Sequence, residues 1–365
     1  MIEERVITEK KKYSVGAMTV FTLAVVAFII VGIYYLLKTM GEKELHTPVA
    51  GLESSGVEMT ELSGEGSSVE LPEGHILYEG REYKLNSDLI CILVMGLDVE
   101  LYTEVGGQSW EENPDSYNRG GQADSLFLAL LNPHTEEISL VGINRNSMAD
   151  VDVWDENGTY RGTYIQQIAL QHGYGNDPVE CAEHQVKAVS RMLHGIPIHA
   201  YAAISMDAIP ELNDVVGGVT VEVLDDIVYP EYDMDLHQGD TVTLMGDKAY
   251  WYVRLRNEDQ FDSNSLRLER QKQYISAFLA KARDGVSSDI GTAVELFNTM
   301  QKYMTTDLNV SSYTYLVSET KGYDFSADRI YSIEGETFQG ERFEEFYVDD
   351  EALRKLIVEL FYEPV

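Results

Sequence analysis

Positive charge and cysteine are both scarce in this sequence. The 365 residues include 27 lysines and arginines against 62 aspartates and glutamates, and the formal net charge is −35. A protein this acidic repels nucleic-acid phosphates, so non-specific nucleic-acid binding is excluded. Only two cysteines occur, and Cys91 lies inside an apolar run. We therefore expect Cys91 and Cys181 to be buried free thiols rather than a disulfide.

Familiar catalytic motifs are also missing. The sequence contains no nucleophile elbow, no P-loop, no zinc-binding pattern and no glycine pattern typical of a dinucleotide-binding fold. Cys181 and His184 share a predicted helix, but their spacing matches no metal-ligand pattern, and we interpret His184 as a solvated helix residue. Any chemistry must therefore come from acidic residues and arginines.

One long uncharged run lies near the N-terminus. Residues 14–37 carry no charge over 24 residues, and at about 1.5 Å per residue they can cross a hydrocarbon core of roughly 30 Å. The lysines at positions 10–12 predict a cytoplasmic N-terminus over residues 1–13 and an extracytoplasmic body. A cleaved signal peptide is the alternative, but no small-residue cleavage site directly follows. We predict a single-pass anchor in the cell membrane, followed by a loosely ordered extracytoplasmic linker over residues 38–85.

The remaining chain alternates between strand-like and helix-like segments. Residues 89–98 form an apolar run typical of a strand buried on both faces. Residues 124–131 and 137–145 are predicted to form an antiparallel hairpin. Asp177 followed by Pro178 indicates the start of a helix, and a long helix is expected over residues 264–283.

This alternation predicts an α/β fold. We expect a three-layer α-β-α domain with a central mixed β-sheet over residues 86–285, and a C-terminal helical extension over residues 286–365.

Arginines are concentrated between Tyr252 and Tyr274. The positive residues of this stretch are Arg254, Arg256, Arg267, Arg270 and Lys272. On an extended strand Arg254 and Arg256 point to the same side. On a helix Arg267, Arg270 and Gln271 lie near one face. Because guanidiniums pair bidentately with phosphate oxygens, the stretch predicts an anion site. The alternative is a salt-bridged surface, since acidic residues, including Asp262 and Glu269, are interleaved with the arginines.

Acidic residues and a further arginine fall at predicted strand ends. Asp98 ends the first strand, Asp124 begins the second and Arg145 ends the third. In a hairpin the start of one strand lies beside the end of its partner, so Asp124 and Arg145 should be neighbours, and Asp98 joins them if its strand runs parallel to the third. Two carboxylates beside arginines are suited to a Mg²⁺ ion bridged to phosphate oxygens. A helix cap, a turn aspartate or a buried ion pair is the structural alternative.

Eight short motifs occur in the order of one known family. They are Gly96–Asp98, Ala123–Asp124, Ile143–Arg145, Gln167–Ala169 with His172–Gly173, Gly195–Ile198, Val216–Val219, Gly246–Arg256 and Arg267–Gln271. With these motifs and its N-terminal anchor, the sequence resembles the LytR–CpsA–Psr (LCP) proteins over about residues 88–285.

The resemblance implies a membrane-anchored phosphotransferase. LCP proteins transfer a cell-wall glycopolymer, such as a teichoic acid or a capsule, from an undecaprenyl-pyrophosphate carrier to peptidoglycan through a phosphodiester, with Mg²⁺. The polyprenyl tail is expected in an apolar slot between the sheet and its helices. The resemblance implies that Asp98 and Asp124 bind the metal ion. It makes Asp124, Arg145, Arg254 and Arg256 catalytic, and it assigns pyrophosphate binding to Arg145, Arg254, Arg256, Arg267, Arg270 and Gln271.

Several positions depart from the usual LCP residues. Gln122 stands where an arginine is usual, Asn146 where an aspartate is usual, Ile165 where a lysine is common and Asn264 where an acid is frequent, while Gln167 takes an asparagine position. These changes predict a variant member. They leave two alternatives open: a polyprenyl-pyrophosphate hydrolase that uses water as the nucleophile, and a non-catalytic protein that binds the lipid or regulates envelope functions.

Overall fold

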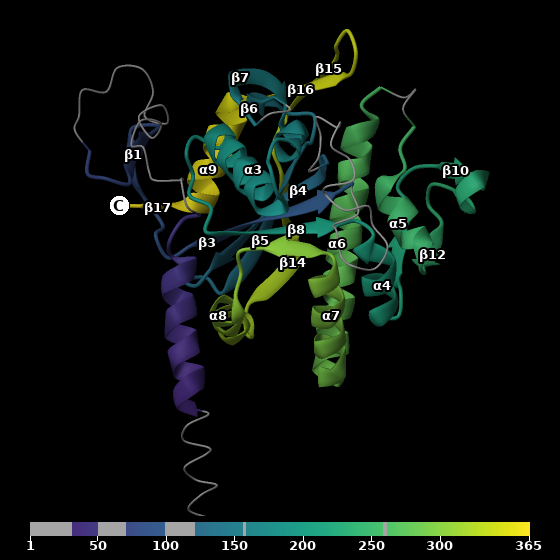
Figure 1. The fold of residues 1–365 in the computed structure, drawn as a ribbon, viewed down its shortest axis with the longest axis horizontal. Helices are drawn as coiled ribbons and strands as arrows, with labels where there is room; N and C mark the ends of the chain where they lie inside the picture. The colour runs from purple at the N-terminus through teal and green to yellow at the C-terminus, as the bar shows by residue number, and fades with distance from the viewer. Residues whose placement is uncertain (1–30, 50–70, 99–120, 156–157, 258–260) are drawn as a thin grey trace, which may run out of the picture.

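The computed structural model describes residues 31–49, 71–98, 121–155, 158–257 and 261–365 (Figure 1). At its centre lies a six-stranded sheet in the order β13-β8-β3-β4-β5-β14. Its strands are β3 (Ile90–Leu97), β4 (Ala123–Asn132), β5 (Glu137–Ile143), β8 (Ala200–Ser205), β13 (Met304–Thr306) and β14 (Asp324–Ser332). β3 is parallel to β8 and antiparallel to β4, while β5 is antiparallel to β4 and parallel to β14. The sheet is therefore mixed, and the predicted hairpin of β4 and β5 is confirmed.

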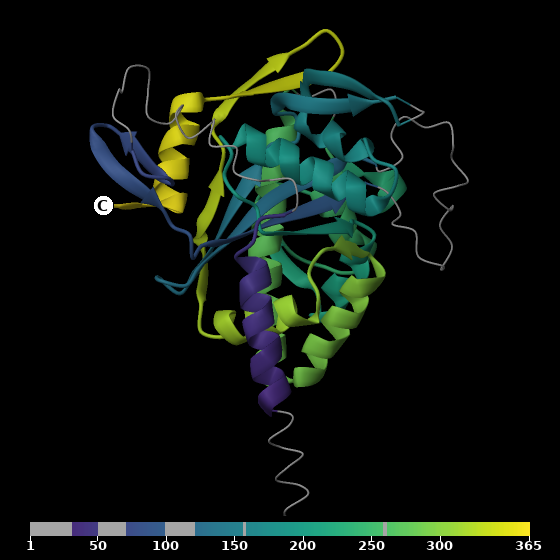
Figure 2. The same ribbon diagram turned by 60° about the vertical axis from the view of Figure 1, so that its left-hand side comes forward.

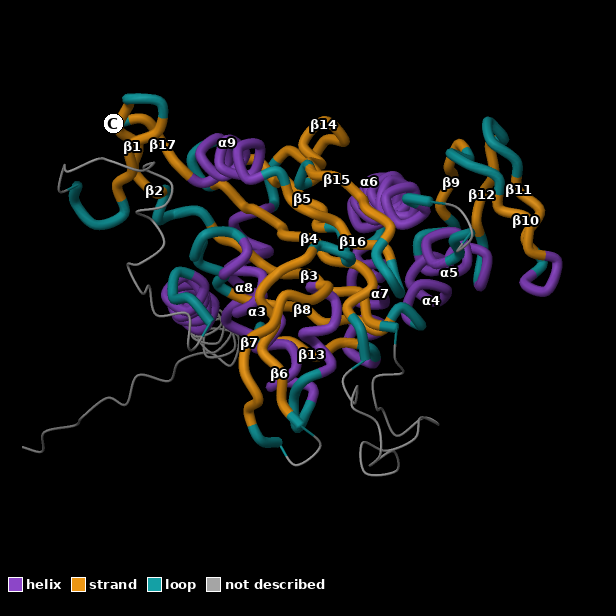
Figure 3. The backbone as a smooth tube through the Cα atoms, turned by 90° about the horizontal axis from the view of Figure 1, so that it is seen from above, coloured by secondary structure: helices purple, strands orange, loops and turns teal. Residues whose placement is uncertain are grey.

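Helices cover both faces of this sheet, which explains why β3 is apolar throughout. One face packs against α3 (Pro178–Met192) and α9 (Asp350–Phe361). The opposite face packs against a helix over residues 31–45, against α6 (Ser263–Ser288) and against α8 (Val310–Thr320), while α7 (Ile290–Lys302) packs on α6. Viewed from above, the helices lie on either side of the strands (Figure 3). The predicted three-layer α-β-α arrangement is confirmed.

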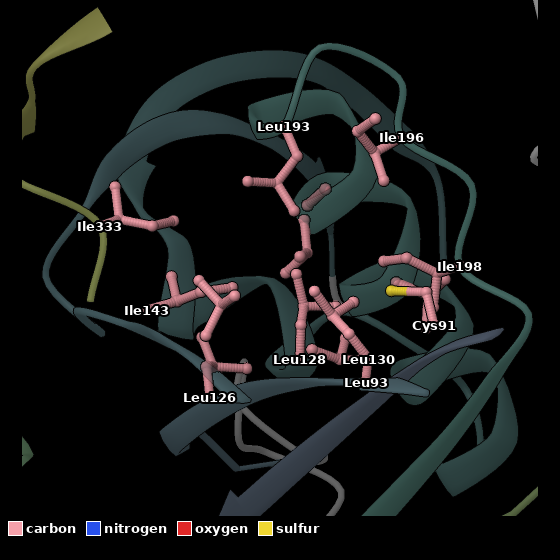
Figure 4. Close-up of a cluster of buried hydrophobic side chains, with 14 of the residues drawn as sticks. Cys91, Leu93, Leu126, Leu128, Leu130, Ile143, Leu193, Ile196, Ile198 and Ile333 are labelled. Atoms are coloured by element: carbon pink, nitrogen blue, oxygen red, sulfur yellow. The ribbon is translucent and has the colours of Figure 1, made fainter. Parts of the chain in front are cut away.

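The main hydrophobic core lies between the sheet and α3. Alternate side chains of β3 and β4 point to this face because successive residues of a strand face opposite sides. In Figure 4 the side chains of Leu93 and Leu128 extend toward Leu193 and Ile196, which follow α3, and the same view shows Ile143 and Ile333 at the edge of this cluster. Burying one such aliphatic side chain contributes roughly 1.5–3 kcal/mol.

A smaller unit with its own core flanks the sheet. Its helices are α4 (Ala208–Val215) and α5 (Asp247–Arg254), and a 3₁₀ turn spans Pro230–Tyr232. Its strands are β9 (Val219–Glu222), β10 (Ile227–Tyr229), β11 (Met234–Leu236) and β12 (Thr241–Leu244). β12 pairs with β9 and β10 with β11, and Tyr252 of α5 is fully buried between them and α6. This core fixes α5, which carries Arg254, against α6.

Two hairpins lie together beyond the end of β5. They are β6 (Met148–Trp154) with β7 (Tyr160–Gln167), and β15 (Gly335–Gln339) with β16 (Glu344–Val348). Ser147 forms a β-bridge with Phe346, which joins the two hairpins (Figure 1). A 3₁₀ helix over Ile168–Gly173 leads from β7 toward α3.

The expected linker contains ordered structure. β1 (His75–Tyr78) and β2 (Arg81–Leu85) form a hairpin, and β2 also pairs with β17 (Tyr362–Pro364) near the C-terminus. A loosely ordered linker was therefore the wrong prediction for residues 71–85, because a strand contributed by the far end of the chain completes their sheet. Residues 50–70 of the linker lie outside the described residues.

The helix over residues 31–45 packs against α8 (Figure 2). Lys38 forms an ion pair of 2.6 Å with Glu319, and Glu44 accepts hydrogen bonds from the hydroxyls of Ser311 and Ser312 at 2.8 and 3.1 Å. Most of the predicted membrane span 14–37, and all of the predicted tail 1–13, lie outside the described residues. Among the helices that the structure does describe, none combines the length and apolar character that a membrane crossing requires.

The C-terminal residues 286–365 are more than a helical extension. They contribute β13 to one edge of the central sheet and β14 to the other, and α9 packs into the main core. The expected boundary after residue 285 falls inside α6. The sequence pattern missed this because β13 has only three residues and β14 is half-exposed, so neither carries the apolar run that marked β3.

Candidate active site

The predicted acids and arginines meet where β3 and β5 end and β4 begins. Asp98 directly follows β3, and its N–H donates to the carbonyl of Gln122 at 3.3 Å. Asp124 is the second residue of β4, and Arg145 follows β5 by two residues. Nη1 of Arg145 lies 2.6 Å from Oδ1 of Asp124. The neighbour relation predicted from strand direction is confirmed.

Asp124 lies between two guanidiniums. Its Oδ2 is 3.7 Å from Nη1 of Arg267, which comes from the second turn of α6. Asp124 is 7% and Arg267 4% exposed, so the group is largely removed from water. The buried Arg267 and the largely covered Arg145 share one carboxylate here, which leaves an excess of positive charge.

Arg254 extends the cluster toward the surface. Its Nη2 pairs with Oδ1 of Asp98, and its guanidinium lies 5.1 Å from the ring centre of Tyr250. Arg254 is the last residue of α5 and Leu255 is extended. The predicted alternation of Arg254 and Arg256 along one strand is therefore wrong, since a helix end separates them. Arg256 Nη1 lies 3.5 Å from the hydroxyl of Ser263 at the start of α6.

Arg270 and Gln271 have different surroundings. Arg270 is 1% exposed, and it donates from Nη1 to the carbonyl of Tyr252 at 2.5 Å and from Nη2 to that of Leu255. Gln271 donates to the carbonyl of Val253 at 3.2 Å. The last carbonyls of a helix lack partners within the helix, so these two side chains cap the end of α5. Both side chains are thus hydrogen-bonded to backbone carbonyls at the end of α5.

Burial and neighbouring charge shift the titration of the cluster. Burial raises the pKa of Asp98, and the adjacent Arg254 opposes that rise while Asp124 adds to it. Burial lowers the pKa of Arg145, which Asp124 partly offsets. Burial also lowers the pKa of Arg267 to about 9, so this side chain still carries its charge at neutral pH.

Two unusual residues belong to the site. Oε1 of Gln122, where an arginine was expected from the family pattern, accepts a hydrogen bond from Nη2 of Arg145. Oδ1 of Asn264 accepts one from Nη2 of Arg267 at 2.6 Å. In the sequence, Gln122 and Asn264 stood out only as departures from the family motifs. Their spacing gave no indication that they would bond to Arg145 and Arg267. Ile165 lies on β7 and is 60% exposed.

Predictions about the cysteines and His184 have different outcomes. Cys91 and Cys181 are buried free thiols, as expected. His184 was predicted to be solvated, which is wrong: its ring stacks on Trp154 at a centroid distance of 4.1 Å and its Nδ1 bonds to the carbonyl of Tyr174. A lone histidine on a helix face gives no sign of an aromatic partner from a distant hairpin.

The site can be tested against the donor set that Mg²⁺ prefers. Among the described residues no group of three or more His, Cys, Asp or Glu side chains is arranged to hold a metal ion. Asp124 is close enough to Asp98 for its charge to raise the pKa of Asp98. Two carboxylates fit an ion that takes one or two of them and completes its shell with phosphate oxygens and water.

The chain is thus a mixed α/β domain with a carboxylate–guanidinium cluster at the ends of its central strands. Residues 49–357 match the family model described as the LytR_cpsA_psr family. This chain belongs to that family.

The sequence relatives of this chain are distant. The chain is 26% identical over 202 residues to the polyisoprenyl-teichoic acid–peptidoglycan teichoic acid transferase TagU of Halalkalibacterium halodurans, covering 55% of this chain and 60% of that one. It is 26% identical over 267 residues to biofilm regulatory protein A of Streptococcus mutans, covering 70% and 59%. The chain thus spans about three fifths of the length of these two relatives.

Solved structures share the fold. Protein gbs0355 from Streptococcus agalactiae superposes with a TM-score of 0.57 at 22% identity, over 74% of this chain and 87% of that one. TagV of B. subtilis gives 0.54 at 23%, over 74% and 96%. A structure described as TagT bound to LI-WTA gives 0.51 at 19%, over 74% and 89%.

Proposed function

We propose that this protein is a membrane-anchored glycopolymer phosphotransferase. It moves a glycopolymer from an undecaprenyl-pyrophosphate carrier to peptidoglycan, with its N-terminus in the cytoplasm and its folded body outside the cell. One observation carries the proposal: Asp98, Asp124, Arg145, Arg254 and Arg267 converge on one place from five separate elements, β3, β4, β5, α5 and α6. The name of the relative TagU, a teichoic acid transferase to peptidoglycan, supports it.

The chemistry needs charge neutralisation more than a protein nucleophile. A hydroxyl of the acceptor attacks the phosphorus that carries the polymer, an O–P bond forms, and the P–O bond to the carrier phosphate breaks. The leaving polyprenyl phosphate keeps the electron pair, and the hydroxyl proton is released. Arg145 and Arg267 stabilise the charge on the phosphate oxygens from within the protein, where a pre-positioned cation is most effective, and Arg254 and Arg256 do so from the rim.

Asp98 and Asp124 are the residues that would hold Mg²⁺. When bound, the ion would supply further neutralisation of the two phosphates. Both carboxylates are also paired with arginines, so they keep the guanidiniums oriented whether or not the ion is present. For Arg270 and Gln271 we propose a supporting role through α5, since both are bonded to its carbonyls.

The lipid part of the donor is proposed to lie in an apolar slot between the sheet and its helices. β3 and β5 end at the arginine cluster and β4 begins there, so a chain held along these strands would present its pyrophosphate to the guanidiniums.

A single incubation distinguishes this function from the two alternatives. The full-length protein is mixed with a lipid-pyrophosphate-linked glycan, peptidoglycan fragments and Mg²⁺, and the products are analysed by mass. We expect a phosphodiester-linked glycan–peptidoglycan product. Release of the glycan to water would show a hydrolase, and binding of an unchanged lipid would show a non-catalytic protein. An Arg145→Ala variant controls for activity that does not come from the site.

A further inference from the structure

A line of buried amide side chains runs from Arg267 into the protein. Asn264 accepts from Nη2 of Arg267 at 2.6 Å and donates from its Nδ2 to Oδ1 of Asn144 at 2.5 Å. The same Oδ1 accepts the backbone N–H of Asn146 at 2.9 Å. All of these side chains are less than a tenth exposed. The hydrogen bonds inside this line are therefore not exchanged with water, and each depends on its neighbours.

The line ends on the C-terminal hairpin β15–β16. Nε2 of Gln167 donates to Oδ1 of Asn146 at 3.1 Å and to the carbonyl of Glu344 at 2.8 Å. The N–H of Phe346 donates to the carbonyl of Asn146 at 3.0 Å. We call Asn144, Asn146, Gln167 and Asn264 the amide line. It connects β16, which no sequence motif singled out, to an arginine of the site.

The same hairpin also holds the beginning of α6. Oε1 of Glu344 accepts the N–H of Asp262 at 2.8 Å, and the hydroxyl of Thr337 donates to Oδ1 of Asp262 at 2.5 Å. Asp262 directly precedes α6 and has a left-handed backbone, with φ of 60°. A non-glycine residue keeps this conformation only when its surroundings fix it. The hairpin therefore fixes the chain five residues before Arg267, as well as reaching it through the amide line.

Amides are suited to these positions because they donate and accept at once. A carboxylate at position 167 would face the acceptors on Asn146 and Glu344 without a proton to donate. A carboxylate at position 264 would face Oδ1 of Asn144 in the same way. An unmatched buried acceptor costs more than the hydrogen bond it replaces. The amides at 146, 167 and 264, which the sequence showed only as departures from the usual family residues, are thus matched to one another and to the hairpin.

We propose that the amide line and the hairpin β15–β16 are positioning elements that set the orientation of Arg267 toward the donor pyrophosphate. This inference rests on the function proposed above. Neither Gln167 nor Glu344 is proposed to touch the substrate, and both act through Arg267. The role of the C-terminal part of the chain would then be to complete the active site.

The decisive variant is Gln167→Glu, with Gln166→Glu as its matched control on the opposite side of the same strand. Binding of inorganic pyrophosphate to the full-length protein is measured by titration calorimetry. We expect Gln167→Glu to weaken binding about threefold to tenfold, the size of one or two lost hydrogen bonds, and Gln166→Glu to leave it unchanged. In an Arg267→Ala background, Gln167→Glu should have no further effect, because the residue through which it acts is gone.

Other results would overturn the inference. An equal loss in the presence and absence of Arg267, or no loss at all, shows that the line does not act through this arginine. If Gln167→Glu does not fold, Glu344→Ala tests the hairpin end, with Glu345→Ala as control.

A failure of the proposed function would show differently. If the wild-type protein binds no pyrophosphate, the proposed function is contradicted. The positioning of the start of α6 is then measured by hydrogen–deuterium exchange. We expect faster exchange at residues 262–268 in Gln167→Glu than in wild type and Gln166→Glu, and unchanged exchange would contradict positioning.

Discussion

Arg270 donates a hydrogen bond from Nη1 to the carbonyl oxygen of Tyr252, at 2.5 Å, on the helix that ends at Arg254. Its Nε lies 3.1 Å from Oδ1 of Asp225, as an ion pair without hydrogen-bond geometry. We predict that Asp225→Asn lowers the free energy of unfolding by about 1–2 kcal/mol, because the buried guanidinium of Arg270 loses its counter-charge. The loss stays moderate because Asp225 is partly exposed, and water screens the ion pair.

Chemical denaturation measures this loss. The control is Asp226→Asn, next in the chain, whose side chain is 66% exposed. Equal stability of the two variants would show that Asp225 contributes nothing to holding α5.

Asp124 is the only carboxylate in contact with both Arg145 and Arg267 in the described part of the chain. We predict that Asp124→Asn lowers the free energy of unfolding by about 3–5 kcal/mol, because the buried Arg267 and the largely covered Arg145 then repel each other without compensation. Turnover that depends on Mg²⁺ should fall with it. Urea unfolding with and without pyrophosphate separates the two effects, since a bound anion restores charge balance and should recover stability. No recovery would argue against an anion site.

The pH dependence of turnover should report on Asp98. Burial raises the pKa of this carboxyl and Arg254 holds it down, so removal of Arg254 raises it further. If the ionised form is active, activity is lost as pH falls through this pKa, and the acid limb of kcat/KM moves to higher pH in Arg254→Gln. Lys248→Gln removes one positive charge from the same helix and should leave the limb in place. If the acid limb lay at the same pH in Arg254→Gln and Lys248→Gln, Asp98 would be excluded as the group that causes it.

Contact between the helix over residues 31–45 and α8 depends on a glycine. A Cβ added at Gly41 would lie 2.0 Å from the carbonyl oxygen of Ser311, whereas one added at Gly32 meets nothing within 4 Å. We predict that Gly41→Ala lowers the melting temperature, while Gly32→Ala leaves it unchanged or raises it because alanine favours a helix by up to about 1 kcal/mol. Equal melting temperatures would show that the helix does not pack on α8.

The sequence anticipated the parts of the site that depend on strand direction. The hairpin ending at Arg145 was sufficient to predict that Asp124 and Arg145 are neighbours, because paired strands place the start of one beside the end of the other. Asp98 was expected to join them only if its strand ran parallel to the third, and in the structure β3 and β5 both run antiparallel to β4. The environment of Arg270 was not accessible in this way. Spacing places Arg267 and Arg270 near one helix face, but only packing against α5 determines which guanidinium faces the cluster and which caps carbonyls.

The sequence by itself determined the charge of the body, the mixed α/β layers and the acids and arginines of the candidate site, since periodicity and residue chemistry are local properties. Only the tertiary structure decided that β14 and α9 belong to the central domain, that Arg254 ends a helix, and that Asn146, Gln167 and Asn264 connect Arg267 to the hairpin β15–β16. Those relations join residues far apart in the sequence. Gln167 and Glu344, for example, are 177 positions apart, and a hydrogen bond over such a separation exists only once the chain has closed the loop between its partners.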